Sequence, residues 1–93
     1  MLTLEEAKAL AIKHVRDVCA DKSIELAVLD KSTVVKSYGW ELRVNSRAYA
    51  ETGDFLEMLA GHGAVIVRHN GKVNVLGATE SVEAFEKKHW LKP

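Results

Sequence analysis

The sequence predicts an α+β domain in which an N-terminal helix packs on a four-stranded antiparallel sheet, with the element order α-β-β-α-β-β-α. Three patterns support this fold class. Residues 4–18 place apolar side chains at helical spacing, residues 40–45 alternate apolar with polar side chains, and Asn70-Gly71 separates two runs rich in β-branched residues. Ninety-three residues suit one domain, so residues 1–93 are expected to form a single unit.

The N-terminal helix is marked by a capping box, in which Thr3 is followed three residues later by Glu6. We expect the helix to end near residues 20–22. At about 100° per residue, small and aliphatic side chains fall on one stripe that is expected to face the sheet. The members of this stripe are Leu4, Ala7, Ala11, Val15 and Val18.

Two strands are expected next. Residues 24–36 are rich in β-branched and aliphatic side chains with a polar break at residues 30–32, which predicts one long or bulged strand. Residues 37–39 form a turn, and the alternation that begins at Trp40 predicts the second strand.

A short second helix is expected after Gly53. Asp54 and Glu57 have the spacing of another capping box, an apolar run follows, and Gly61 stands where a glycine commonly ends a helix.

Residues 64–69 and 72–76 are expected to pair as a hairpin through a two-residue Asn-Gly turn. The pairing that follows leaves both sheet faces partly apolar. The predicted partners on one face are Arg68 with Val73, Ile66 with Val75 and Ala64 with Gly77, and on the other Val65 with Leu76, Val67 with Asn74 and His69 with Lys72.

The last helix is expected over residues 81–89, with Thr79 as its N-cap and with Val82, Phe85 and His89 on one face. Because both faces of the sheet are partly apolar, either this helix covers the second face or a partner does. A homodimer formed through the second sheet face is one such partner.

Composition narrows the function classes. Thirteen basic and thirteen acidic side chains cancel, and nucleic-acid binders usually carry a basic excess, so we expect no nucleic-acid partner. No apolar run is long enough to cross a bilayer, so we expect no membrane partner. The single Cys19 cannot form an internal disulfide, which favours a reducing cytoplasm.

No catalytic or metal-binding set emerges from the sequence. His62 and His69 lie at opposite ends of one predicted strand, about 20 Å apart at roughly 3.3 Å per residue, which is too far to share a metal ion. Cys19 lies near a helix C-terminus, the wrong end to lower the pKa of its thiol. We therefore expect neither enzymatic activity nor a cofactor, and a small enzyme using Cys19 or a histidine is the remaining alternative.

Ordered motifs from Tyr38 onward carry a family resemblance. They are Gly39-Trp40, Tyr49, Glu51-Thr52-Gly53-Asp54, Leu59-Ala60-Gly61, Val65-Ile66-Val67, Gly71, Val75-Leu76-Gly77, and Glu83 with Phe85. In order and spacing, over about two-thirds of the chain, these motifs resemble the bacterial immunity protein 35 family, to which the YrhB-type chaperone domain also belongs. The chain departs from the family at Ala64, where proline is common, at Arg68, near which an acidic residue is common, and at residues 77–79.

The resemblance implies an immunity protein that binds and sterically neutralises a cognate bacterial toxin, such as a papain-like peptidase. The alternative that it implies is a chaperone-like module that suppresses aggregation. Trp40, as an aromatic residue opening an alternating strand, fits a core position better than an interface. The candidate partner-binding residues are Trp40, Tyr49, Glu51, Asp54, His62 and His69.

Overall fold

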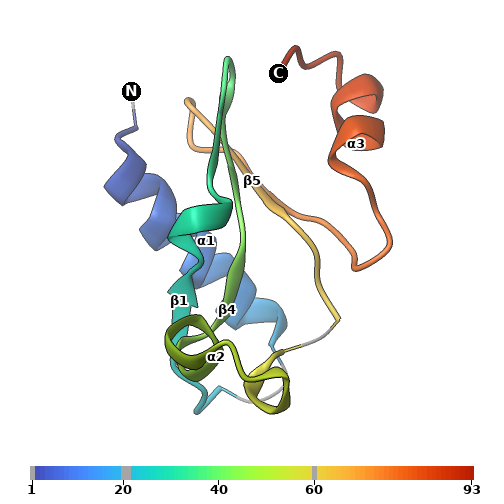
Figure 1. Ribbon diagram of the computed structural model, residues 1–93. Helices are drawn as coiled ribbons and strands as arrows, with labels where there is room; N and C mark the ends of the chain where they lie inside the picture. Colours follow the sequence, from blue (N-terminus) through green and yellow to red (C-terminus); the bar gives the residue numbers. More distant parts are fainter. Residues whose placement is uncertain (1, 20–21, 60) are drawn as a thin grey trace.

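The computed structural model describes residues 2–19, 22–59 and 61–93. The chain is an α+β fold with its N-terminal helix on an antiparallel sheet, as predicted (Figure 1). The described helices are α1 (Leu4–Val18), α2 (Arg47–Thr52) and α3 (Val82–Lys88), with 3₁₀ turns η1 (Asp30–Ser32) and η2 (Phe55–Glu57). The described strands are β1 (Leu26–Val28), β2 (Val34–Lys36), β3 (Gly39–Leu42), β4 (Val44–Ser46), β5 (Val65–Arg68) and β6 (Val73–Val75).

Two antiparallel sheets are built from these strands. The four-stranded sheet has the order β2-β3-β5-β6, and β1 pairs with β4 in a separate two-stranded sheet. The polar break predicted at residues 30–32 is the 3₁₀ turn η1, which divides the expected long strand into β1 and β2. The second predicted strand likewise divides into β3 and β4, so β2 pairs with β3 and β1 pairs with β4.

The N-terminal helix begins as predicted. The Glu6 amide donates to Thr3 Oγ1 at 3.2 Å, and the Thr3 amide donates to Glu6 Oε1 at 3.0 Å, which completes the capping box. Ala7, Ala11 and Val15 are fully buried against the sheet, whereas Val18, the last helical residue, is 64 % exposed. The helix ends at Val18 rather than at residues 20–22, of which 20 and 21 lie outside the described residues.

The hairpin register differs from the predicted one by one residue. The Gly71 amide donates to the Arg68 carbonyl, Gly71 has φ 89°, and the Arg68 amide donates to the Lys72 carbonyl. This is a three-residue loop, a type I turn closed by a left-handed glycine, and not the two-residue turn expected. The observed partners are Val65 with Val75, Ile66 with Asn74, and Val67 with Val73.

This register sorts the side chains into two hydrophobic clusters on opposite faces of the sheet. The larger, beneath α1, includes Leu42, Val65 and Val67. The smaller lies beneath α3 and consists of Ala64, Ile66, Leu76 and Phe85. Figure 1 shows the two helices on opposite sides of the sheet. The chain's own helix α3 therefore covers the second face of the sheet.

The cap of α3 also differs from the prediction. Ser81, not Thr79, is the N-cap, because the Ala84 amide donates to Ser81 Oγ at 3.0 Å. Within the described part of the chain, no helix has the length and apolar character needed to cross a membrane.

Candidate functional site

The segment between β4 and β5 departs most from the sequence expectation. The helix here is α2, which the sequence reading missed, and Ser46 caps it by accepting a hydrogen bond from the Tyr49 amide at 3.0 Å. Gly53, with φ 71°, ends α2 instead of preceding a helix. Asp54 does act as a cap, but only for the single 3₁₀ turn η2, where its carboxylate accepts from the Leu56 amide at 3.0 Å.

Two buried polar side chains at the end of β4 hold this segment in place. Asn45 Oδ1 accepts hydrogen bonds from the Leu59 amide at 2.7 Å and the Ser46 amide at 2.8 Å, and its Nδ2 donates to the Leu59 carbonyl at 3.2 Å. The Ser46 hydroxyl donates to the Glu57 carbonyl while accepting from α2. The bonds from Asn45 to Leu59 and from Ser46 to Glu57 join the loop to the sheet across 14 and 11 residues. The loop therefore has a defined shape.

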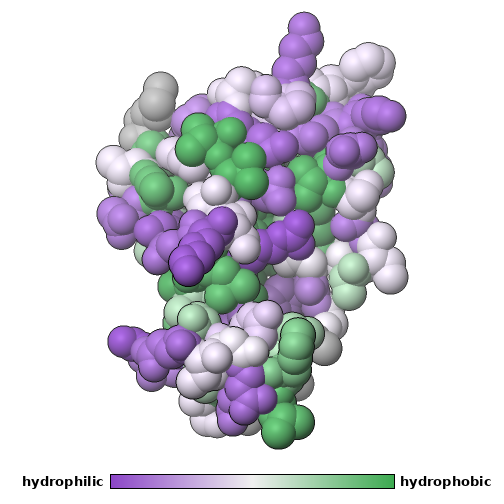
Figure 2. All heavy atoms as spheres, in the orientation of Figure 1, coloured by the Kyte–Doolittle hydropathy of each residue, from purple (hydrophilic) through white to green (hydrophobic). Residues whose placement is uncertain are grey.

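The η2 segment presents apolar side chains to solvent. Phe55 is 79 %, Leu56 91 % and Met58 44 % exposed, and we call these three residues the η2 tip. The Phe55 ring lies 6.4 Å from the Tyr49 ring, which connects the tip to α2. Figure 2 shows an apolar patch at the lower end of the molecule, over η2. Three large apolar side chains exposed together are typical of an interaction surface.

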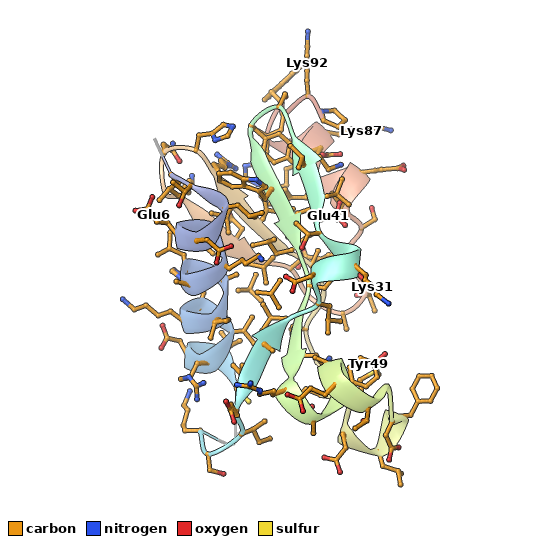
Figure 3. All side chains as sticks on the ribbon, turned by 60° about the vertical axis from the view of Figure 1, so that its left-hand side comes forward. Glu6, Lys31, Glu41, Tyr49, Lys87 and Lys92 are labelled. Atoms are coloured by element: carbon orange, nitrogen blue, oxygen red, sulfur yellow. The ribbon has the colours of Figure 1, made fainter. Side chains whose placement is uncertain are left out.

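Clefts flank α2 on two sides. One cleft, of about 560 Å³, lies between α2 and the β1–η1 segment. Its lining includes Tyr49 and Lys31, both labelled in Figure 3. The other, of about 490 Å³, is lined by Leu56, Met58 and Leu59. Leu56 and Met58 of the tip therefore form part of the wall of the smaller cleft.

The charged groups around the η2 tip are mostly acidic. Arg47 donates to Glu25 at 2.7 Å and to Glu51 at 2.9 Å, and these bonds, led by that to Glu51, raise the pKa of the guanidinium. Glu57 and Asp54 are exposed and form no ion pair with any described residue. Glu25, Glu51, Asp54 and Glu57 stand against Arg47 and Lys31 around the tip and its clefts, so these surroundings carry net negative charge.

A second polar cluster lies under α3. The Tyr38 hydroxyl donates to Glu86 Oε2 at 2.7 Å, and Lys36 Nζ lies 3.1 Å from the same oxygen and 3.7 Å from Glu41 Oε1. Burial, followed by the bond to Glu86, raises the pKa of the Tyr38 hydroxyl. Glu41 lies on the sheet in Figure 3. This cluster is explained by structure alone, since it joins α3 to the sheet edge and pairs its charges internally.

The structure brings three of the six candidate residues together. Tyr49, Glu51 and Asp54 share the α2–η2 segment, where Glu51 pairs with Arg47 and Asp54 caps η2. Trp40 is 8 % exposed and belongs to the large cluster, as a core residue does.

The two histidine candidates are not part of the α2–η2 segment. His69 packs edge-on against the Trp40 ring at 5.0 Å, and a nitrogen of His62 bonds the Val44 carbonyl at 2.8 Å. Both side chains are half-buried. Among the described residues, no three histidine, cysteine, aspartate or glutamate side chains are grouped to hold a metal ion.

Sequence reasoning missed the three residues of the η2 tip, because it assigned them to a short helix. The signal that was available is Gly53. A glycine in this position ends one helix as readily as it precedes another, and Ser46 with Tyr49 has the spacing of an N-cap. A helix over residues 47–52 leaves too few residues before Gly61 for a second packed one.

Comparisons with protein-family models, with curated proteins and with solved structures found no match for this chain. The resemblance to the immunity protein 35 family therefore depends on the motifs in the sequence.

Proposed function

We propose that this protein binds a cognate bacterial toxin and neutralises it by steric cover, with the η2 tip as the central contact. The family resemblance supports the kind of partner. The observation that carries the proposal is the tip itself, where Phe55 and Leu56 are 79 % and 91 % exposed on a loop that buried side chains hold in shape.

The energetics favour such a loop as a binding element. Full burial of one large apolar side chain contributes about 1.5–3 kcal/mol, and the tip offers Phe55 and Leu56 almost whole and Met58 in part. Because Asn45 and Ser46 fix the loop before binding, little conformational entropy remains to be lost when a partner docks. A rim of polar groups around an apolar centre is the arrangement found at protein interfaces.

Steric inhibition explains how such a protein acts without a catalytic group. A projecting apolar loop enters a substrate cleft and prevents access to it, which suits a papain-like peptidase as the partner. Specificity then depends on whether the cleft accepts Phe55 and Leu56 and tolerates the carboxylates beside them.

The test begins with the tagged protein purified from its native host, where mass spectrometry is expected to find one stoichiometric partner that carries a toxin domain. The partner is then purified and its activity is titrated with this protein. Leu56→Asp is expected to weaken inhibition at least about tenfold, because it puts a charge at the centre of the interface. The matched control is Val35→Asp, since Val35 is 76 % exposed but lies on β2, away from the tip.

Two results would contradict the proposal. One is a native-host purification that yields no toxin-domain protein. The other is equal inhibition by wild type and Leu56→Asp, which would leave the tip without a role. Thermal unfolding of both variants is recorded first, so that a folding defect is not mistaken for lost binding.

The chaperone-like alternative lacks a comparable structural feature. An open, partly apolar second sheet face would suit such a module, but Phe85 of α3 covers that face together with Ile66 and Leu76. The same cover lies over the surface expected to form a homodimer. Suppression of client aggregation by several-fold excess protein remains the direct measurement for this alternative.

A further inference from the structure

The C-terminal end of the molecule exposes one large aromatic side chain in an unusual backbone conformation. Trp90 is 92 % exposed and has φ 58°, the one left-handed residue other than glycine among those described. It follows the last turn of α3, where the Leu91 amide donates to the Glu86 carbonyl at 2.8 Å and the Trp90 amide to the Lys87 carbonyl at 3.3 Å. This helix ending usually places glycine where Trp90 stands, because a side chain is strained there.

The residue after Trp90 holds it in this position. Leu91 packs against the small cluster beneath α3. The next carbonyl, that of Lys92, accepts a hydrogen bond from the Ser37 hydroxyl in the β2–β3 turn. Trp90 is therefore presented to solvent on a fixed frame, which is the property that makes an exposed aromatic an effective anchor.

Positive charge surrounds Trp90. Lys87, Lys88 and Lys92 are within three residues of it in the sequence, and Lys87 and Lys92 lie at the same end of the molecule in Figure 3. Lys72 lies in the neighbouring β5–β6 loop, and none of these four lysines forms an ion pair with any described residue. We call Trp90 with these four lysines the C-terminal tip.

Arg68 adds to this uncompensated charge. Its guanidinium lies over the Phe85 ring, 5.8 Å from the centroid, and its Nε and Nη2 are buried without a hydrogen-bond partner. The pKa of nearby His89 is lowered by burial first and then by Arg68, Lys88 and Lys72. Among the described residues, Arg68 and the four lysines thus contribute positive charge at this end that no ion pair takes up.

We propose that the C-terminal tip of one molecule binds the η2 tip of a second copy of this chain, head to tail. The two tips lie at opposite ends of the molecule (Figure 1) and complement each other. One has a single protruding aromatic ring among lysines, and the other has three apolar side chains and two clefts among carboxylates. The two contacting surfaces differ, so the assembly as a whole keeps one unused tip of each kind, one at either end.

The contact is small, so the association is weak. An interface formed by two loop ends buries less than the roughly 1,200 Å² of a stable complex, which indicates a dissociation constant on the order of 0.1–1 mM. Surface charges contribute to it, so about 0.5 M salt is expected to weaken it severalfold. The inference concerns the protein alone and does not require the toxin.

Two variants test the pairing directly. Trp90→Gly removes the aromatic ring of one tip, and Leu56→Lys introduces a lysine into the other, which opposes the lysines of the incoming copy. In sedimentation and NMR dilution series between about 0.05 and 2 mM, wild type is expected to associate, and each variant alone to weaken association at least tenfold. An equimolar mixture is expected to form a one-to-one dimer, since each variant retains the tip that the other lacks.

Val35→Thr, on an exposed apolar residue outside both tips, is the matched control and is expected to associate as wild type does. Wild type that stays monomeric at 2 mM overturns the inference. So does a mixture that gains nothing over its components, or a variant that associates normally on its own. Trp90→Gly is expected to leave toxin inhibition unchanged, so the failure of this inference is distinguishable from the failure of the proposed function.

Discussion

The two ends of the molecule expose apolar side chains, but the fold holds them by different means. At the η2 end, neither α2 nor η2 contains a buried residue, and the segment depends on the hydrogen bonds of Asn45 and Ser46. At the C-terminal end, α3 inserts Phe85 into an apolar cluster and adds the ionic cluster of Glu86.

The difference indicates how each end responds to damage. Hydrogen bonds are local and directional, so loss of one loosens the loop and leaves the sheet intact. An apolar anchor contributes to the core, so its loss lowers the stability of the whole fold.

The largest effect is expected at the apolar anchor. Phe85→Ala removes the main side chain between α3 and the sheet, where Phe85 is 7 % exposed, and should lower the free energy of unfolding by about 3 kcal/mol. Urea unfolding measures this value. The control is Phe55→Ala at the other end, where a 79 % exposed ring should change stability by less than about 0.5 kcal/mol. Equal losses in the two variants would remove the distinction between the ends.

The next effect is expected at the polar anchor. Asn45→Ala deletes three hydrogen bonds and leaves the Leu59 and Ser46 amides without their acceptor, at a cost of about 2 kcal/mol. Hydrogen exchange should accelerate at the Leu59 amide while β5 stays protected. Asn74→Ala is the control, because Asn74 Oδ1 is buried without a partner and its removal should cost nothing. Faster exchange throughout β5 would instead assign Asn45 to the core.

The sequence predicted the fold class because its signals are local. Three features depend on short spacings that the structure reproduces. They are the Thr3–Glu6 capping box, the burial of Ala7, Ala11 and Val15, and the position of the hairpin. The loop length was wrong because Asn-Gly fits a two-residue turn and a three-residue turn with a left-handed glycine equally well.

The candidate site was predictable only in part. Turn chemistry drew attention to Tyr49, Glu51 and Asp54, which do lie together. The exposure of Phe55 and Leu56 was not predictable, because it follows from contacts between Asn45 and Leu59, 14 residues apart. No periodicity within the loop carries that information.

A smaller effect, of opposite sign at the two ends, is expected where the helices finish. Both α2 and α3 are followed by a left-handed residue, Gly53 with φ 71° and Trp90 with φ 58°. Trp90→Gly should raise stability by about 0.5–1 kcal/mol, because it relieves strain and loses almost no burial. Gly53→Ala should lower stability by about 1 kcal/mol through strain alone, since no atom lies within 4 Å of the added carbon. Thermal unfolding of both variants checks the pair, and shifts of the same sign would contradict it.

The smallest effect is a pH dependence confined to the C-terminal end. Burial, with Arg68, Lys88 and Lys72 nearby, lowers the pKa of His89 below its ordinary value of 6.5, so the folded state favours the neutral ring. The contribution of His89 to stability is therefore complete above about pH 6.5 and is lost as the pH falls through its lower folded-state pKa. Between pH 7.5 and 5.5, the melting temperature of wild type should fall further than that of His89→Asn, which cannot take up the proton. Parallel pH profiles would show that the charges around α3 are already balanced, and would weaken the case for an uncompensated basic tip.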